Sequence, residues 1–147
     1  MKLNELIVLV APNRNEDWTQ YIAYKVAEKT GVLYTIDDSI ISPNYILVLE
    51  LGGIYDRGEW DIAIEDMTKS QIFKKVLDFY FDTEDVSKME HTFKTPLAKL
   101  FSEIKSNYVR LELTNKIRYN NESRELLILV LSEIISNVLK TLGGENE

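Results

Sequence analysis

Short apolar runs flank one amphipathic segment in the first third of the chain. Apolar runs at residues 6–10, 32–36 and 45–51 have the length of β-strands, and the last of them is nearly continuous, as expected for a strand buried on both faces. Between the first two runs, Trp18, Ile22 and Val26 recur at helical spacing, and Gly31 is placed to end that helix. The order strand, helix, strand predicts an N-terminal βαβ-like unit.

The rest of the chain predicts two further strands and several helices. The alternation over residues 60–65 favours a strand, with a helix as the alternative, and residues 108–114 alternate in the same way. Helices are predicted at residues 72–81, 83–89, 96–107 and 120–144. The expected start of the first helix is marked by the capping-box pair Thr68 and Gln71, that of the second by Asp82 or Thr83, and that of the third by Thr95-Pro96. The expected end of the fourth helix is Gly143-Gly144.

These elements predict an α/β or α+β fold, with packed helices, a small sheet of three to five strands and a long buried C-terminal helix. The 147 residues suit a single domain over 1–147. Within it we expect an α/β part at about 1–66, a mainly helical part at about 67–144 and a frayed tail at 145–147.

Composition narrows the chemistry. The chain has no cysteine, which excludes disulfides, thiolate nucleophiles and cysteine-ligated metals. No apolar run approaches the roughly 20 residues of a membrane span, and the first run is too short for a signal peptide. We expect a soluble, cytoplasmic protein without a metal, a cofactor or a membrane contact.

Charge is distributed unevenly along the sequence. The net charge is −7, but residues 94–119 hold six basic and two acidic groups. Cations interleaved with aromatic side chains suit nucleic acid or an acidic partner, whereas the overall charge disfavours nucleic acid. A solvated face that neutralises the acidic N-terminal half is the alternative. The candidate binding residues are Lys94, Lys99, Lys105, Tyr108, Arg110, Lys116 and Arg118.

His91, the only histidine, lies in the stretch HTFKTPL. This stretch resembles the phosphoacceptor box of sensor histidine kinases at five positions, namely His91, Lys94, Thr95, Pro96 and Leu97. The resemblance implies that His91 is phosphorylated on a two-helix hairpin. The alternative is that Thr95 and Pro96 form an ordinary helix start with His91 in the preceding turn.

Glu65 is the second candidate catalytic residue. It ends the stretch GGIYDRGEWDIAIE, which loosely resembles TIR-like and nucleoside-deoxyribosyltransferase chains, where a glutamate acts on a ribosyl group. The resemblance implies that Glu65 is a nucleophile. The alternative is a β-hairpin with a solvated acidic face.

By elimination, the leading functional prediction is a non-catalytic binding or regulatory module. It would act through a protein partner or a second copy of the chain, because the helix at 125–142 is unusually apolar for a surface helix. One alternative is a small phosphotransfer or nucleotide-processing enzyme that uses His91 or the Glu59–Glu65 region. Another is a nucleic-acid-associated protein that uses residues 94–119.

Overall fold

The computed structural model describes residues 2–12, 17–54, 60–85, 96–104 and 107–145, without the side chains of 102–104 and 144–145. One mixed sheet runs through it in the order β2-β1-β3-β6-β4-β5. Its strands are β1 (Ile7–Val10), β2 (Leu33–Thr35), β3 (Leu47–Gly53), β4 (Ile62–Asp66), β5 (Thr83–Asp85) and β6 (Tyr108–Leu113).

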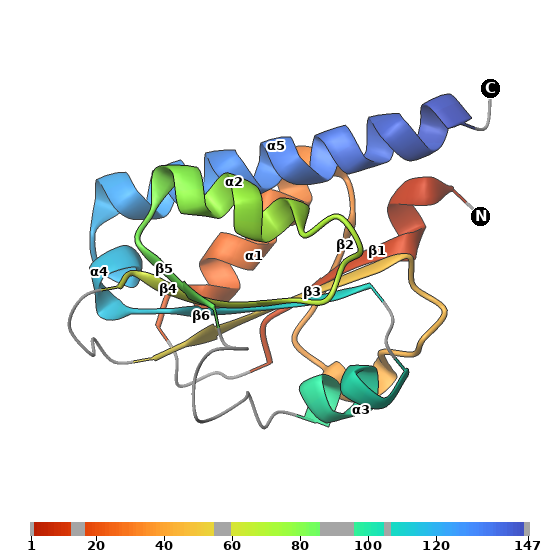
Figure 1. Cartoon of the computed structure of the whole chain (residues 1–147), viewed down its shortest axis with the longest axis horizontal. Coiled ribbons are helices and arrows are strands. Elements are labelled where there is room, and N and C mark those ends of the chain that lie inside the picture. The colour runs from red at the N-terminus through yellow and green to blue at the C-terminus, as the bar shows by residue number, and fades with distance from the viewer. Residues whose placement is uncertain (1, 13–16, 55–59, 86–95, 105–106, 146–147) are drawn as a thin grey trace.

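The helices are α1 (Thr19–Thr30), α2 (Ile72–Tyr80), α3 (Pro96–Ile104), α4 (Asn115–Arg118) and α5 (Asn121–Glu145), with 3-10 turns η1 (Leu3–Leu6) and η2 (Asp38–Ile40). The helices α1, α2 and α5 cover one face of the sheet, and α3 lies on the other (Figure 1). The α/β fold predicted from the sequence is therefore confirmed, and its helices and sheet form three layers.

The strands run in two directions. Strands β1, β2, β3 and β6 are mutually parallel, β4 is antiparallel to β6, and β5 is parallel to β4. From β1 the chain passes through α1 to β2 on one side, whereas β3 pairs with the other side of β1. A switch point therefore lies at the carboxyl ends of β1 and β3, where open α/β sheets usually bind their ligands.

Side-chain alternation divides the interior into two layers. Ile7, Leu9, Leu49 and Leu111 belong to the larger core beneath α1, α2 and α5. Val8, Val48 and Tyr108 point to the opposite face, where they pack with Leu97 and Phe101 of α3. The Phe101 and Tyr108 rings stack with their centroids 5.1 Å apart. Because both faces of the central strands are covered, the near-continuous apolarity of β3 follows.

Several boundaries depart from the sequence predictions. The sheet has six strands rather than three to five. The additional strand is β5, which occupies the start of the short helix predicted at 83–89, because residues 83–85 pair with β4 and backbone pairing outweighs their weak local preference. Helix α5 continues through Gly143-Gly144 to Glu145, and Leu3 of η1 lies beside Gly143. The division into an α/β part and a mainly helical part remains a prediction.

The start of α2 also differs from its prediction. Gln71 precedes the helix with φ +52° and makes no side-chain cap, so Thr68 and Gln71 do not form a capping box. Asp66 takes that role, because its carboxylate accepts hydrogen bonds from Lys74 N at 3.1 Å and from Thr68 N at 2.9 Å. The predicted end of α1 is confirmed: Gly31 has φ +80° and donates its N–H to Ala27 O at 2.8 Å.

Helix α5 is long and apolar enough over residues 121–143 to cross a membrane by length and composition alone. Core helices of soluble proteins share these properties, and Leu127, Leu131 and Ile135 of α5 are buried in the large core. In this α/β fold, α5 therefore packs against the sheet as a core helix. On the outer side of α5, Leu126 and Leu129 are exposed. A contact with a partner there, the absence of a membrane contact and the cytoplasmic location remain predictions.

Candidate functional site

A row of ionisable side chains crosses the middle of the sheet on the face that carries α3. Glu50 of β3 pairs with Arg110 of β6, and Arg110 pairs with Glu65 of β4. On the other side, Glu50 pairs with Val10, the last residue of β1. The row is therefore level with the carboxyl end of β1, beside the switch point of the sheet.

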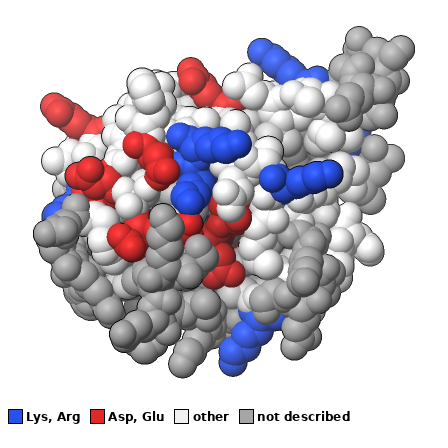
Figure 2. Space-filling model, viewed as in Figure 1, with Lys and Arg blue, Asp and Glu red and all other residues white. Residues whose placement is uncertain are grey.

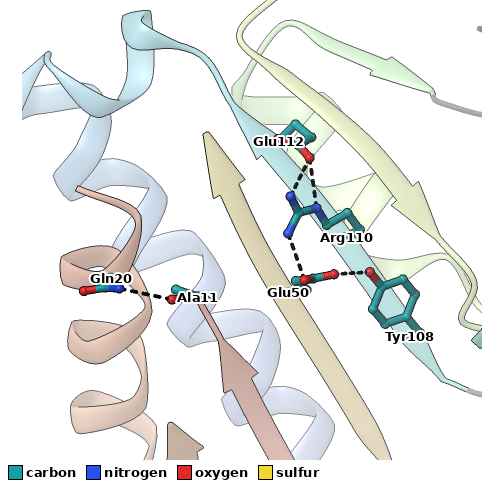
Figure 3. Close-up of polar contacts among 6 residues, drawn as sticks. All are labelled: Ala11, Gln20, Glu50, Tyr108, Arg110 and Glu112. Atoms are coloured by element: carbon teal, nitrogen blue, oxygen red, sulfur yellow. Dashed lines mark hydrogen bonds and ion pairs between the residues drawn. The ribbon is translucent and has the colours of Figure 1, made fainter. Parts of the chain in front are cut away.

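The side chains of Glu50, Arg110, Glu112 and Tyr108 form one connected network (Figure 3). The Arg110 guanidinium lies 3.2 Å from Glu50 Oε2 through Nη1, and it donates to Glu112 Oε1 from Nε at 3.0 Å and from Nη2 at 2.5 Å. The Tyr108 hydroxyl donates to the other Glu50 oxygen, Oε1. One arginine thus bridges two carboxylates from neighbouring strands.

Burial makes this network unusual. Glu50 is 0% exposed, Arg110 4% and Glu112 9%. A buried ion pair recovers the cost of desolvation only with good geometry and additional hydrogen bonds. Burial alone would lower the pKa of Arg110, but the attraction of Glu50 and Glu112 raises it above its usual value. The guanidinium therefore stays charged between the two carboxyl groups.

Glu65 extends the row toward the edge of the sheet. It is half-buried, and one of its carboxylate oxygens, Oε2, is inaccessible to solvent. Its neighbours along β4, Ile64 and Ile62, point into the opposite core, as strand alternation requires. The strand predicted at residues 60–65 therefore exists, and it places the predicted catalytic Glu65 beside the charged network rather than on a solvated hairpin face.

The sequence contained a signal for Glu50 that its apolar surroundings obscured. Glu50 is the single acid in the run YILVLEL, and a strand covered on both faces cannot hold a carboxylate without a partner. The alternation of YVRLEL supplies that partner, because Tyr108, Arg110 and Glu112 share one face of β6. Only the pairing of β3 with β6 brings the two patterns together.

The predicted binding residues do not share one exposed surface. Tyr108, Arg110 and Arg118 are buried, which corrects their placement at an accessible nucleic-acid surface. Lys99 and Lys116 are exposed. On the face shown in Figure 2, acidic side chains gather over the half with α2, β4 and β5, with basic side chains among them. His91, Lys94, Lys105 and Glu59 lie outside the described residues, so phosphotransfer by His91 remains a prediction.

Arg118 holds the carboxyl edge of the sheet together. Its guanidinium donates to three backbone carbonyls: Leu113 O from Nε at 3.0 Å, Ile54 O from Nη2 at 3.2 Å and Asp17 O from Nη1 at 3.3 Å. Gly53 leaves the space that the guanidinium needs, since a Cβ there would lie 2.8 Å from Arg118 Cζ. This arginine therefore joins the segments that follow β1, β3 and β6.

The beginning of α1 is fixed at the same edge. Gln20 donates to Ala11 O at 3.4 Å, which ties α1 to the end of β1 (Figure 3). Trp18 has φ +72°, and its indole ring stacks on the Arg124 guanidinium at 3.7 Å. In the described part of the chain, no group of three or more His, Cys, Asp and Glu side chains is arranged to hold a metal ion. The predictions of no metal and no cofactor remain predictions.

No protein-family model matches the sequence, and no curated protein matches it. Solved structures do match in fold. A bacteriophage poly-gamma-glutamate hydrolase has a TM-score of 0.62 at 13% identity, with 96% of this chain and 86% of that chain covered. An N-formylglutamate amidohydrolase from Ralstonia eutropha JMP134 has a TM-score of 0.45 at 11% identity, with 65% of this chain and 44% of that chain covered.

The first of these comparisons shows the fold. It also contradicts the leading functional prediction of a non-catalytic binding or regulatory module, because the solved structure that shares the fold over 96% of this chain is a hydrolase. That prediction rested on the absence of a convincing catalytic pair in the sequence. The ionisable groups of the row come from three different strands, so no single stretch of the sequence displays them together.

Proposed function

We propose that this chain is a small hydrolase that cleaves amide bonds, with Glu65 as the general base. The observation that carries the proposal is the row of Glu50, Arg110 and Glu65, which lies across three central strands and beside the switch point of the sheet. The fold shared with a poly-gamma-glutamate hydrolase supports the choice of bond. Buried ionisable clusters near ligand-binding edges are frequent at catalytic sites.

The chemistry requires one base and a bound water. Glu65 takes a proton from water as the water oxygen attacks the amide carbonyl carbon. The C–N bond then breaks, and the proton returns from Glu65 to the leaving nitrogen, so that an acid and an amine are formed. Glu50, Glu112 and Tyr108 hold the Arg110 guanidinium next to β4, which gives Glu65 a fixed electrostatic environment.

Charge restricts the substrate. The row and the adjoining Glu112 together contain three carboxyl groups and one guanidinium, and the chain has a net charge of −7. Negative charge at a site disfavours a negatively charged substrate. We therefore propose that the substrate is neutral or cationic around the bond that is cleaved. The lack of cysteine suits a reducing compartment, which supports a cytoplasmic location.

The test compares four substrates: lysyl, alanyl and γ-glutamyl p-nitroanilides, and poly-γ-glutamate. We expect release of p-nitroaniline, fastest from the lysyl or alanyl compound. Glu65→Gln should lower the rate by about a hundredfold or more without lowering the melting temperature. Glu133→Gln, an exposed acid on α5, is the matched control and should leave the rate unchanged.

Two results would count against the proposal in different ways. If no amide is cleaved, or if Glu65→Gln is as active as the unaltered protein, the assignment of the site is wrong. If poly-γ-glutamate is the best substrate, hydrolysis stands but the charge argument fails.

A further inference from the structure

A groove separate from the charged row opens at the amino ends of β3 and β6. Its volume is about 540 Å³, and it adjoins a second hollow of about 250 Å³. The two share Ser70, Ile72, Val138 and Leu142, so they form one continuous groove. Figure 1 shows the segment between β4 and α2 passing under the C-terminal half of α5 at this place. Small-molecule sites commonly measure about 300–1,000 Å³.

The lining of the groove is mostly apolar. Leu47 of β3 and Phe73 of α2 are buried beneath it, and Ile72, Val138 and Leu142 form its walls. These side chains can bury a hydrocarbon chain but offer it no hydrogen bonds. The interior of the groove therefore selects for an apolar ligand body.

Among the described residues, the rim of the groove has a single charge. Of the described residues that line the groove, only Lys69 is ionisable, and its side chain is exposed. Asp66, the nearby acid, is engaged with the backbone of Thr68 and Lys74 at the start of α2. Ser70 and Asn107 add polar groups to the lining around Lys69. A ligand whose apolar chain fills the groove would therefore meet a positive charge at the opening.

We propose that this groove binds an aliphatic monocarboxylate, with the chain against Ile72, Val138 and Leu142 and the carboxylate at Lys69. The apolar walls account for the chain, and charge complementarity with Lys69 accounts for the carboxylate. The groove is at the amino ends of β3 and β6, whereas the Glu50–Arg110–Glu65 row faces α3 and is level with the carboxyl end of β1. The inference therefore does not depend on the proposed hydrolase activity.

Calorimetric titration with octanoate, nonanoate and decanoate, each below its micelle concentration, tests whether the groove binds the hydrocarbon chain of the ligand. Affinity should rise by up to about fourfold per added methylene, the factor for a fully buried methylene.

Decanol and decyltrimethylammonium test the contribution of the negative charge of the ligand, and both should bind more weakly than decanoate. Lys69→Met should weaken decanoate by about two- to fivefold and leave decanol unchanged. Lys99→Met, an exposed lysine on the opposite face of the sheet, is the matched control.

Val138→Phe should remove binding by filling the groove. A thermal melt monitored by circular dichroism shows whether that variant is folded. In the unaltered protein, amide resonances of Ser70 and Asn107 should shift on addition of decanoate, which locates the ligand independently of any variant. No heat and no shift would overturn the proposal. Equal affinity for decanoate and decanol, or an equal effect of Lys99→Met, would overturn the assignment of the carboxylate to Lys69.

Discussion

Replacing Arg110 by methionine should strongly destabilise the protein in a pH-dependent way. Arg110 neutralises Glu50 and Glu112, which are 0% and 9% exposed, so Arg110→Met leaves two buried carboxylates without their cation. Removal of one partner from a buried ion pair typically costs about 3–5 kcal/mol. For a chain of 147 residues, this predicts a melting temperature lower by about 6–20 °C at pH 7.

The dependence on pH follows from the same cause. Without Arg110, burial raises the folded-state pKa of the orphaned carboxyls above the unfolded value of about 4.3. The variant is therefore least impaired below that value and loses stability as the pH rises. The loss should grow by about 1.4 kcal/mol per pH unit for each carboxyl that is protonated only in the folded state.

Urea unfolding of both proteins at pH 4, 5, 6 and 7 measures this difference in the free energy of unfolding. A triple variant with Glu50→Leu, Arg110→Met and Glu112→Leu should recover most of the loss, since no buried charge remains. Lys99→Met should change the free energy by less than about 0.5 kcal/mol. The reasoning is refuted if Arg110→Met costs under about 1 kcal/mol at pH 7, or if its cost is the same from pH 4 to pH 7.

Three further predictions concern local features. Gly53→Ala should lower the free energy of unfolding by about 1–3 kcal/mol in urea titrations, because the added methyl group meets the buried Arg118 guanidinium. Gly31→Ala should cost about 1–2 kcal/mol in the same assay, because its φ of +80° is unfavourable for alanine. Asp37 accepts hydrogen bonds from Ser39, which lowers the pKa of Asp37. Its contribution to η2 is therefore complete above about pH 4 and lost as the pH falls through the lowered pKa, and NMR titration of Ser39 N–H should follow this loss.

Local patterns were sufficient for most elements of the fold. The helical spacing of Trp18, Ile22 and Val26 predicts α1, and the alternation of residues 108–113 predicts β6. Both patterns consist of the spacing of apolar residues that are close in the sequence. The edge strand β5 could not be predicted in this way, because its three residues gain their structure from pairing with β4.

The candidate site was only partly visible in the sequence. The sequence predicts Glu65 as a candidate and a strand around Arg110, but it places Arg110 on an exposed surface. Polar positions of a strand face solvent when one side of the sheet is open. Here α3 covers that side around Tyr108, so the polar positions of β6 turn inward and require partners.

The sequence by itself determined where most of the helices and strands form, because hydrophobic periodicity is a property of neighbouring residues. Only the tertiary structure decided which side chains meet. Glu50 and Arg110 are sixty residues apart in the chain, and the parallel register of β3 and β6 places them side by side. The antiparallel register of β4 adds Glu65. Strand order sets these contacts, and strand order depends on long-range packing that no local pattern encodes.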